Sequence, residues 1–224
     1  SLNAGATGSN QIGNGNQVLT VSGTLNTNSA GNGDGGEINL RGPQINIIDG
    51  ATISASALGS GFGGDVFISA LGSDADLNLG LGTTIAVRSN SGTGGSIDAA
   101  ASRNVSLSGS LLDAGSLQGD GGSITLEAGS AGSGLLNVDA DIVADAGGSG
   151  NGGALFLLQN SQLAIQIGTL ANGGSPGTGL LSASSFGGGK GGNLTLNSGA
   201  GNDLSVAVNQ NSLLAGSSPD ALGT

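Results

Sequence analysis

The chain has 224 residues, 48 of which are Gly, whereas Cys, His, Met, Trp and Tyr are absent. A compact core usually relies on large apolar and aromatic side chains, so this composition argues against an ordinary globular domain. The net charge is −11, and the positive side chains are Arg41, Arg88, Arg103 and Lys190, which argues against nucleic acid or an anionic membrane surface as a partner.

Gly-Gly pairs recur along the chain, and an alternating apolar run follows most of them. After Gly35-Gly36, for example, Ile38 and Leu40 alternate with polar residues. High Gly content without a Gly-x-y period excludes collagen, and the recurring alternation argues against a disordered linker. The pattern therefore predicts Gly-turned β repeats. The pairs are Gly35-Gly36, Gly63-Gly64, Gly94-Gly95, Gly121-Gly122, Gly152-Gly153 and Gly191-Gly192.

Each repeat contains three short alternating runs separated by Gly, Ser, Asn and Asp, which predicts one triangular coil of a parallel β-solenoid. No segment has the apolar stripe of an amphipathic helix, so we expect an all-β fold with essentially no helix. No apolar run approaches the roughly 20 residues of a membrane span. We expect one domain over 1–224 with about seven three-stranded coils: 1–36, 37–64, 65–95, 96–122, 123–153, 154–192 and 193–224.

The coils align at their third corner. Eleven positions before the second Gly of a pair lie Leu25, Ile53, Ile142 and Leu181, with Ile85, Leu112 and Leu214 as the expected equivalents elsewhere. Stacked coils bury equivalent residues above one another. The expected packing residues are Ile38, Leu40, Ile45, Ile47, Ile53, Val66, Ile68, Ile124, Leu126, Leu194 and Leu196.

Three of the four Phe residues have different expected positions. Leu58 and Phe186 occupy the same slot inside a turn, which predicts that Phe186 plugs a corner. Phe67 and Phe156 follow Gly-Gly pairs and are expected to lie in strands, with Phe67 facing outward because it falls on the polar phase.

Two segments, ATISASALGSGFGGDVFISA (51–70) and LSASSFGGGKGGNLTLNS (181–198), resemble the repeats of filamentous-haemagglutinin-like exoproteins, especially the cyanobacterial type. Those repeats have an Ile-Ser-Ala-Ser turn, a Gly-rich corner and a Gly-Gly-Asn-Ile-x-Ile run. The resemblance implies a right-handed parallel β-helix, exported by two-partner secretion and displayed on the surface of a Gram-negative-type cell. The secretion domain of that family is not recognisable in this sequence.

Acidic residues are the candidates for catalytic or metal-binding groups. Asp74/Asp76 and Asp139/Asp141 are i, i+2 pairs that would share a face if extended, with Asp145 nearby, and glycoside hydrolysis uses paired carboxylates. The simpler interpretation is that they are solvated turn and edge residues. Without His or Cys, a Ser–His or Cys–His nucleophile system is impossible. We therefore expect no enzyme activity and no catalytic residues.

Cofactor sites are also not expected. Asp34, Asp65 and Asp120 lie beside Gly-Gly corners, where incidental Ca²⁺ could bind, but the Ca²⁺-binding nonapeptide is not repeated. The Gly-x-Gly-x-x-Gly sequences at 31–36 and 59–64 precede predicted strands, not helices, so they do not indicate a dinucleotide site. No cofactor-binding or metal residues are predicted.

Three functions remain to be compared. The first is an extracellular structural or adhesive rod, either a filament subunit whose coils stack end to end or a segment of a long exoprotein. The second is an adhesin module that binds glycans or cell surfaces through an insertion around 171–179, although a flexible bulge is the favoured interpretation of so Gly-rich a loop. The third, a polysaccharide lyase or hydrolase, is disfavoured by the missing aromatic and basic residues. Lacking an initiator Met and a signal segment, the chain is expected to be a processed product or an excerpt.

Overall fold

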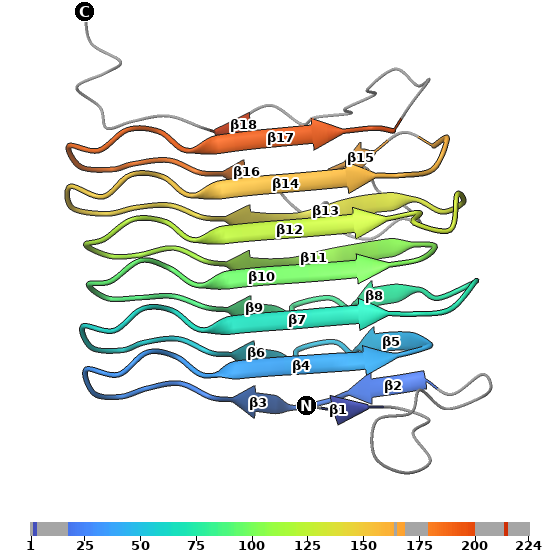
Figure 1. The fold of residues 1–224 in the computed structure, drawn as a ribbon, viewed down its shortest axis with the longest axis horizontal. Helices are drawn as coiled ribbons and strands as arrows, with labels where there is room; N and C mark the ends of the chain where they lie inside the picture. Colours follow the sequence, from blue (N-terminus) through green and yellow to red (C-terminus); the bar gives the residue numbers. More distant parts are fainter. Residues whose placement is uncertain (1, 4–17, 164, 169–178, 200–212, 215–224) are drawn as a thin grey trace, which may run out of the picture.

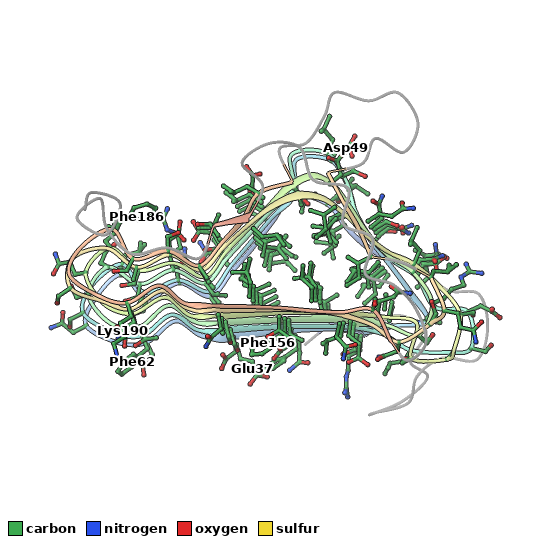
Figure 2. All side chains as sticks on the ribbon, turned by 90° about the horizontal axis from the view of Figure 1, so that it is seen from above. Glu37, Asp49, Phe62, Phe156, Phe186 and Lys190 are labelled. Carbon is green, nitrogen blue, oxygen red and sulfur yellow. The ribbon has the colours of Figure 1, made fainter. Side chains whose placement is uncertain are left out.

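The computed structural model describes residues 2–3, 18–163, 165–168, 179–199 and 213–214. These residues form a parallel β-solenoid of about five complete turns, in which successive coils stack from the N-terminal to the C-terminal end (Figure 1). No helix occurs among them, which confirms the predicted all-β class. A view along the stack reveals a triangle with a narrow lobe at one corner (Figure 2).

The first side of the triangle is a seven-stranded parallel sheet, here called the front sheet. Its strands are β1 (Leu2–Asn3), β4 (Glu37–Gly42), β7 (Asp65–Ala70), β10 (Ser96–Ala101), β12 (Ser123–Ala128), β14 (Ala154–Gln159) and β17 (Asn193–Asn197). Where the preceding residues are described, these strands begin directly after a Gly-Gly pair.

The other two sides belong to one eleven-stranded sheet that bends at the apex marked by Asp49 in Figure 2. The second face contains β2 (Val18–Val21), β5 (Gln44–Ile47), β8 (Leu77–Leu79) and β15 (Gln166–Ile167). The third face contains β3 (Thr24–Asn26), β6 (Thr52–Ser54), β9 (Thr84–Ala86), β16 (Leu181–Ser182) and β18 (Leu213–Leu214). Two longer strands, β11 (Val105–Asp113) and β13 (Leu136–Val143), run through both faces.

The coils are therefore not uniformly three-stranded. In β11 the register shifts between Ser108 and Ser110, where Gly109 adopts a φ of 53°. This left-handed conformation, which Gly adopts without a steric penalty, lets the strand bend around the apex without ending.

The core is a set of apolar columns that run along the stack. The predicted third-corner column is confirmed by the register, which pairs Leu25 with Ile53, Ile53 with Ile85, Ile85 with Leu112, Leu112 with Ile142 and Ile142 with Leu181. At the last step the prediction was wrong by one residue, because Leu181 pairs with Leu213 and Leu214 pairs with Ser182.

The predicted packing residues face inward. Nine of the eleven are buried, and Leu194 and Leu196 of β17 pack against the core while staying partly exposed. These two are less covered because, within the described residues, β17 pairs with β14 alone. Burial of each fully buried Leu or Ile side chain stabilises the fold by roughly 1.5–3 kcal/mol.

The lobe is formed by the segments before each front-sheet strand, such as residues 55–64. In that segment the backbone nitrogen of Gly64 donates to the carbonyl oxygen of Ala55 at 2.7 Å, and the same bond recurs in the other coils. Serine hydroxyls fill its interior: Ser89 Oγ donates to Gly61 O, and Ser116 Oγ to Gly92 O, both at 2.7 Å. The predicted corner is thus a closed chain reversal whose flanking strands pair only between coils.

Candidate functional site: a glycine-floored groove beside the lobe

A shallow groove of about 580 Å³ runs along the stack where the lobe meets the front sheet. Its floor is formed by successive Gly-Gly pairs, from Gly63 to Gly152-Gly153. Phe62 and Thr93 line the lobe side, and the first residues of front-sheet strands line the other. In Figure 2, Phe62 lies on this side of the lobe, and Phe186 lies on the opposite side.

The floor is glycine because neighbouring coils approach too closely for a side chain. A Cβ on Gly63 would lie 2.1 Å from the Val87 carbonyl oxygen, and one on Gly64 would lie 2.0 Å from the Gly36 carbonyl oxygen. Neither Gly has a positive φ, so close approach, not backbone conformation, requires these residues. The Gly-Gly pairs that mark the repeat in the sequence are therefore points of close contact between neighbouring coils.

The groove offers apolar surface and uncharged hydrogen-bonding groups. Phe62 is 57 % exposed, which is high for an aromatic side chain. The chain contains only four aromatic residues, all of them Phe. Thr93 and Ser123 supply hydroxyls to the lining, while the Asp65 carboxylate is engaged by Ser96 Oγ at 2.5 Å. Such a surface, with one carboxylate in its lining, suits an elongated neutral ligand lying along the stack more than an anionic one.

The corner carboxylates considered for Ca²⁺ have structural partners. Asp34 Oδ1 accepts the backbone nitrogen of Phe62 at 2.8 Å, and Asp120 Oδ1 accepts that of Asn151 at 2.6 Å. In both cases the acceptor lies one coil below the donor. Within the described part of the chain, no three His, Cys, Asp or Glu side chains gather as a metal site.

The Asp74/Asp76 pair is part of an ion pair and not an acid–base dyad. Arg103 Nε donates to Asp76 Oδ1 at 2.8 Å, and Nη2 donates to Oδ2 at 2.5 Å. The hydrogen bonds from Arg103 lower the pKa of Asp76, and hydrogen bonds from Asn104 lower it further. Burial acts in the opposite direction and raises it. Asp74 is 77 % exposed and lies 3.9 Å from Arg103 Nη1. A paired carboxylate with a lowered pKa is unsuited to act as a general acid near neutral pH.

The second acidic group is divided by the apex of the triangle. Asp139 follows the residues of β13 that pair with second-face strand β15, and Asp141 precedes those that pair with third-face strand β16. Asp145 lies further along, where its Oδ1 accepts Ser182 Oγ at 2.5 Å and the Ser184 backbone nitrogen at 2.7 Å. The structure does not bring these carboxylates together as a catalytic pair.

One buried carboxylate was missed by sequence reasoning. Asp113 Oδ1 accepts the backbone nitrogen of Gly115 at 2.8 Å, and Oδ2 lies 3.2 Å from Arg88 Nε. Burial raises the pKa of Asp113, and the negative charge of Asp145 adds to the rise, while the Gly115 bond and Arg88 oppose it. The signal in the sequence was an acidic residue directly after the apolar pair Leu111-Leu112.

The Gly-x-Gly-x-x-Gly segments lie in the lobe and precede β4 and β7, not helices. A Cβ on Gly59 would lie 2.1 Å from the Gly31 carbonyl oxygen, and one on Gly61 would lie 2.2 Å from that of Gly33. Gly59 and Gly61 therefore serve coil stacking, and strands follow both segments as predicted.

The predicted plug role of Phe186 was wrong, because Phe186 is 62 % exposed and its counterpart Leu58 is 53 % exposed. The lobe is closed by backbone hydrogen bonds, and Ser hydroxyls such as Ser89 and Ser185 bond to its backbone carbonyls from inside. Phe67 faces outward as predicted, in register with Asn39 and Asp98. Phe156 shares that column on the outer side of the front sheet.

The predicted insertion at 171–179 lies outside the described residues except for Gly179. Among the described residues, no helix is long and apolar enough to cross a membrane. Comparisons with family models, curated proteins and solved structures found no match for this chain.

Proposed function

We propose that this chain is an extracellular structural or adhesive rod, either a subunit that stacks end to end or a segment of a long exoprotein. The observation that carries the proposal is the continuous parallel ladder of the front sheet, whose stacked coils share one apolar core. Within the described residues, β1 pairs with β4 alone and β17 with β14 alone. Strand edges of this kind accept a further strand from the same chain or another copy.

The finer architecture belongs to the same proposal: a right-handed solenoid of seven coils with boundaries at the Gly-Gly pairs. The seven front-sheet strands among the described residues support the count. The direction of the chain supports the right-handed coiling of the solenoid. In Figure 1 the front-sheet strands run from left to right while the coils rise from the N-terminal to the C-terminal end. In Figure 2 the second and third faces return the chain behind the front sheet. Two-partner secretion and display on a Gram-negative-type cell surface rest on the resemblance of 51–70 and 181–198 to haemagglutinin-like repeats.

The Ile-Ser-Ala-Ser element gains a physical role that supports this resemblance. Asn28 Oδ1 accepts Ser54 Oγ at 2.7 Å and the Ser56 backbone nitrogen at 2.6 Å. Asp145 makes the same pair of bonds with Ser182 and Ser184. The two serines of each Ser-Ala-Ser thus tie one coil to an Asn or Asp of the coil below.

End-to-end stacking can be tested by electron microscopy of the purified chain over a range of concentrations. Particles that lengthen with concentration support self-assembly, and particles that stay short and monodisperse contradict it. Leu196→Lys places an inward-pointing charge on β17 and should abolish lengthening. Leu81→Lys is the matched control, because Leu81 is 60 % exposed at the apex, away from both edges.

A second candidate, an adhesin module for glycans or cell surfaces, is favoured by the groove and its exposed Phe62. We place recognition in the groove instead of the 171–179 insertion. Glycan-array binding that is lost in Phe62→Ala but kept in Phe186→Ala supports it, since both rings are similarly exposed on opposite sides of the lobe. Binding lost on deleting 172–178, or no glycan bound at all, contradicts it.

We further propose that the chain is not an enzyme. The engagement of Asp76 by Arg103 and the separation of Asp139 from Asp141 support this, because acid–base hydrolysis needs two free carboxylates across one bond. Release of reducing ends from acidic polysaccharides by the purified chain would contradict it.

A further inference from the structure

The outer side of the second face carries a column of polar side chains. The register aligns Asn46, Asn78, Ser106, Asn137 and Gln166 in successive coils. Asn78 Nδ2 donates to Asn46 Oδ1 at 2.9 Å, which begins an amide ladder. A depression of about 540 Å³ lies over the first three members of this column, and its lining includes Asn46, Asn78, Ser106 and Ser108 but neither Asn137 nor Asp139.

The ladder is interrupted at Ser106, and two oxygens beyond it have no partner. Asn137 Oδ1 and Asp139 Oδ1 are both buried without a hydrogen-bond donor. Asn137 is only 8 % exposed. Burying an acceptor without a partner is costly, and it is more costly for a carboxylate than for an amide. Two such oxygens on one strand indicate a site for a species that satisfies both.

The register places these two residues opposite two hydroxyls. Asn137 pairs with Ser106 and Asp139 pairs with Ser108 of the coil below. Residues i and i+2 share a face, so ideal strand spacings place the four side chains at the corners of a rectangle of about 4.8 by 6.6 Å on the outer side of the second face. The centre of this ideal rectangle is about 4 Å from each Cβ, a distance that a side-chain oxygen and its bond to a cation can span.

We propose that Asn137, Asp139, Ser106 and Ser108 form a calcium-binding site on the outer side of the second face. The donor set consists of one carboxylate, one amide oxygen and two hydroxyls, which are the hard oxygen ligands that Ca²⁺ takes. Ca²⁺ tolerates irregular geometry, whereas Mg²⁺ demands a near-ideal octahedron that a flat rectangle does not supply. The net charge of −11 also favours a cation at the surface.

This site differs from the corner positions at Asp34, Asp65 and Asp120, which were considered for incidental Ca²⁺ but not predicted as metal sites. A single carboxylate with waters completing the shell places its affinity in the weak range of extracellular modules, about 10⁻⁴–10⁻³ M. The inference does not depend on the rod or adhesin proposals, because it rests on oxygens inside one face of the coil.

The test is equilibrium dialysis of the full chain with calcium up to about 5 mM, above the expected range of dissociation constants. Wild type should bind one more calcium per chain than Asp139→Asn, and Asn137→Ala should bind at least about fivefold more weakly than wild type. Asp98→Asn is the matched control, since it removes the same charge from an outward position of the front sheet and should bind like wild type. Far-UV circular dichroism establishes that each variant is folded.

Thermal unfolding provides a second measurement. Saturating CaCl₂ should raise the melting temperature of wild type and of Asp98→Asn by about 2–4 °C, without doing so in Asp139→Asn. The proposal is overturned if MgCl₂ at equal ionic strength gives the same rise, if Asp139→Asn retains the extra calcium, or if wild type binds none.

Discussion

Gly64 lies against the carbonyl oxygen of Gly36 in the coil below, so closely that a Cβ on Gly64 would be 2.0 Å from that oxygen. The same close approach relates Gly95 to Gly64 and Gly122 to Gly95. Because the atom that would be struck belongs to the backbone, no side-chain rotation can relieve the contact. Each second Gly of a pair therefore sets how closely two coils can pack.

Substituting Gly64 with Ala should destabilise the chain by about 3 kcal/mol or prevent folding, because a buried overlap with backbone must shift a whole coil. Gly31→Ala is the control: Gly31 is also in the lobe and has no positive φ, and a Cβ on it would meet no atom within 4 Å. Urea unfolding followed by circular dichroism measures both. Equal stability of the two variants would contradict the role assigned to the Gly-Gly pair.

The exposed position of Phe186 leads to a second prediction. Phe186→Ser should change the free energy of unfolding by less than about 0.5 kcal/mol, as surface substitutions do. Leu181→Ala, five residues earlier, should cost about 3 kcal/mol because Leu181 is fully buried in the third-corner column. If Phe186→Ser proves as costly as Leu181→Ala, the ring packs inside the lobe after all.

Much of the fold was predictable because stacking repeats the same physical requirement in every coil. Ile53, Ile142 and Leu181 lie at a constant distance from a Gly-Gly pair, and both features are imposed by the coil below. Parallel pairing then fixes the register. The error at Leu214 arose where the chain offers two adjacent leucines and no described Gly-Gly pair to count from.

The functional surfaces were less predictable because they depend on neighbours in other coils. Phe186 was placed inside the lobe, since sequence alone does not reveal that Gly64 closes such a reversal onto Ala55. Asp76 was considered as half of a carboxylate pair, but its partner Arg103 lies one coil away in the chain. The groove and the oxygens of Asn137 and Asp139 likewise emerge only when the register is known.

The Arg103–Asp76 contact predicts a stability loss in acid. The pKa of Asp76 is lowered in the fold, so its contribution is present above the unfolded value of about 3.9 and is lost as the pH falls through the lowered pKa. Asp76→Asn should be less stable than wild type at pH 7, and the difference should shrink at about pH 2–3. Asp74→Asn, an exposed control, should have the same stability as wild type at each pH. If Asp76→Asn is less stable than wild type by the same amount at all pH values, the proposed coupling between protonation of Asp76 and stability is contradicted.

Asp113 predicts the opposite dependence. Its pKa is raised mainly by burial, so its contribution is fully present below the unfolded value of about 3.9 and is lost as the pH rises through the folded pKa. Asp113→Asn keeps an oxygen for the Gly115 nitrogen without the buried charge, and should therefore be more stable than wild type at pH 7 and similar at about pH 3. Urea unfolding at both pH values measures this, with Asp98→Asn as the control. Lower stability of Asp113→Asn at pH 7 would indicate that the Arg88 ion pair outweighs burial.

The buried amide of Gln159 supports a final prediction. Gln159 is fully buried at the end of β14. Its Oε1 accepts a hydrogen bond from the Leu136 backbone nitrogen at 2.6 Å, and its Nε2 donates to the Gly134 carbonyl oxygen at 2.6 Å. These bonds tie one coil to the loop before β13. Gln159→Leu conserves volume but leaves both backbone groups unpaired, so it should cost about 2–4 kcal/mol. In Gln166→Leu, an exposed position on β15, the change should be below about 0.5 kcal/mol. Hydrogen exchange should locate the Gln159→Leu effect at Leu136, and unchanged protection there would mean that the amide does not hold this loop.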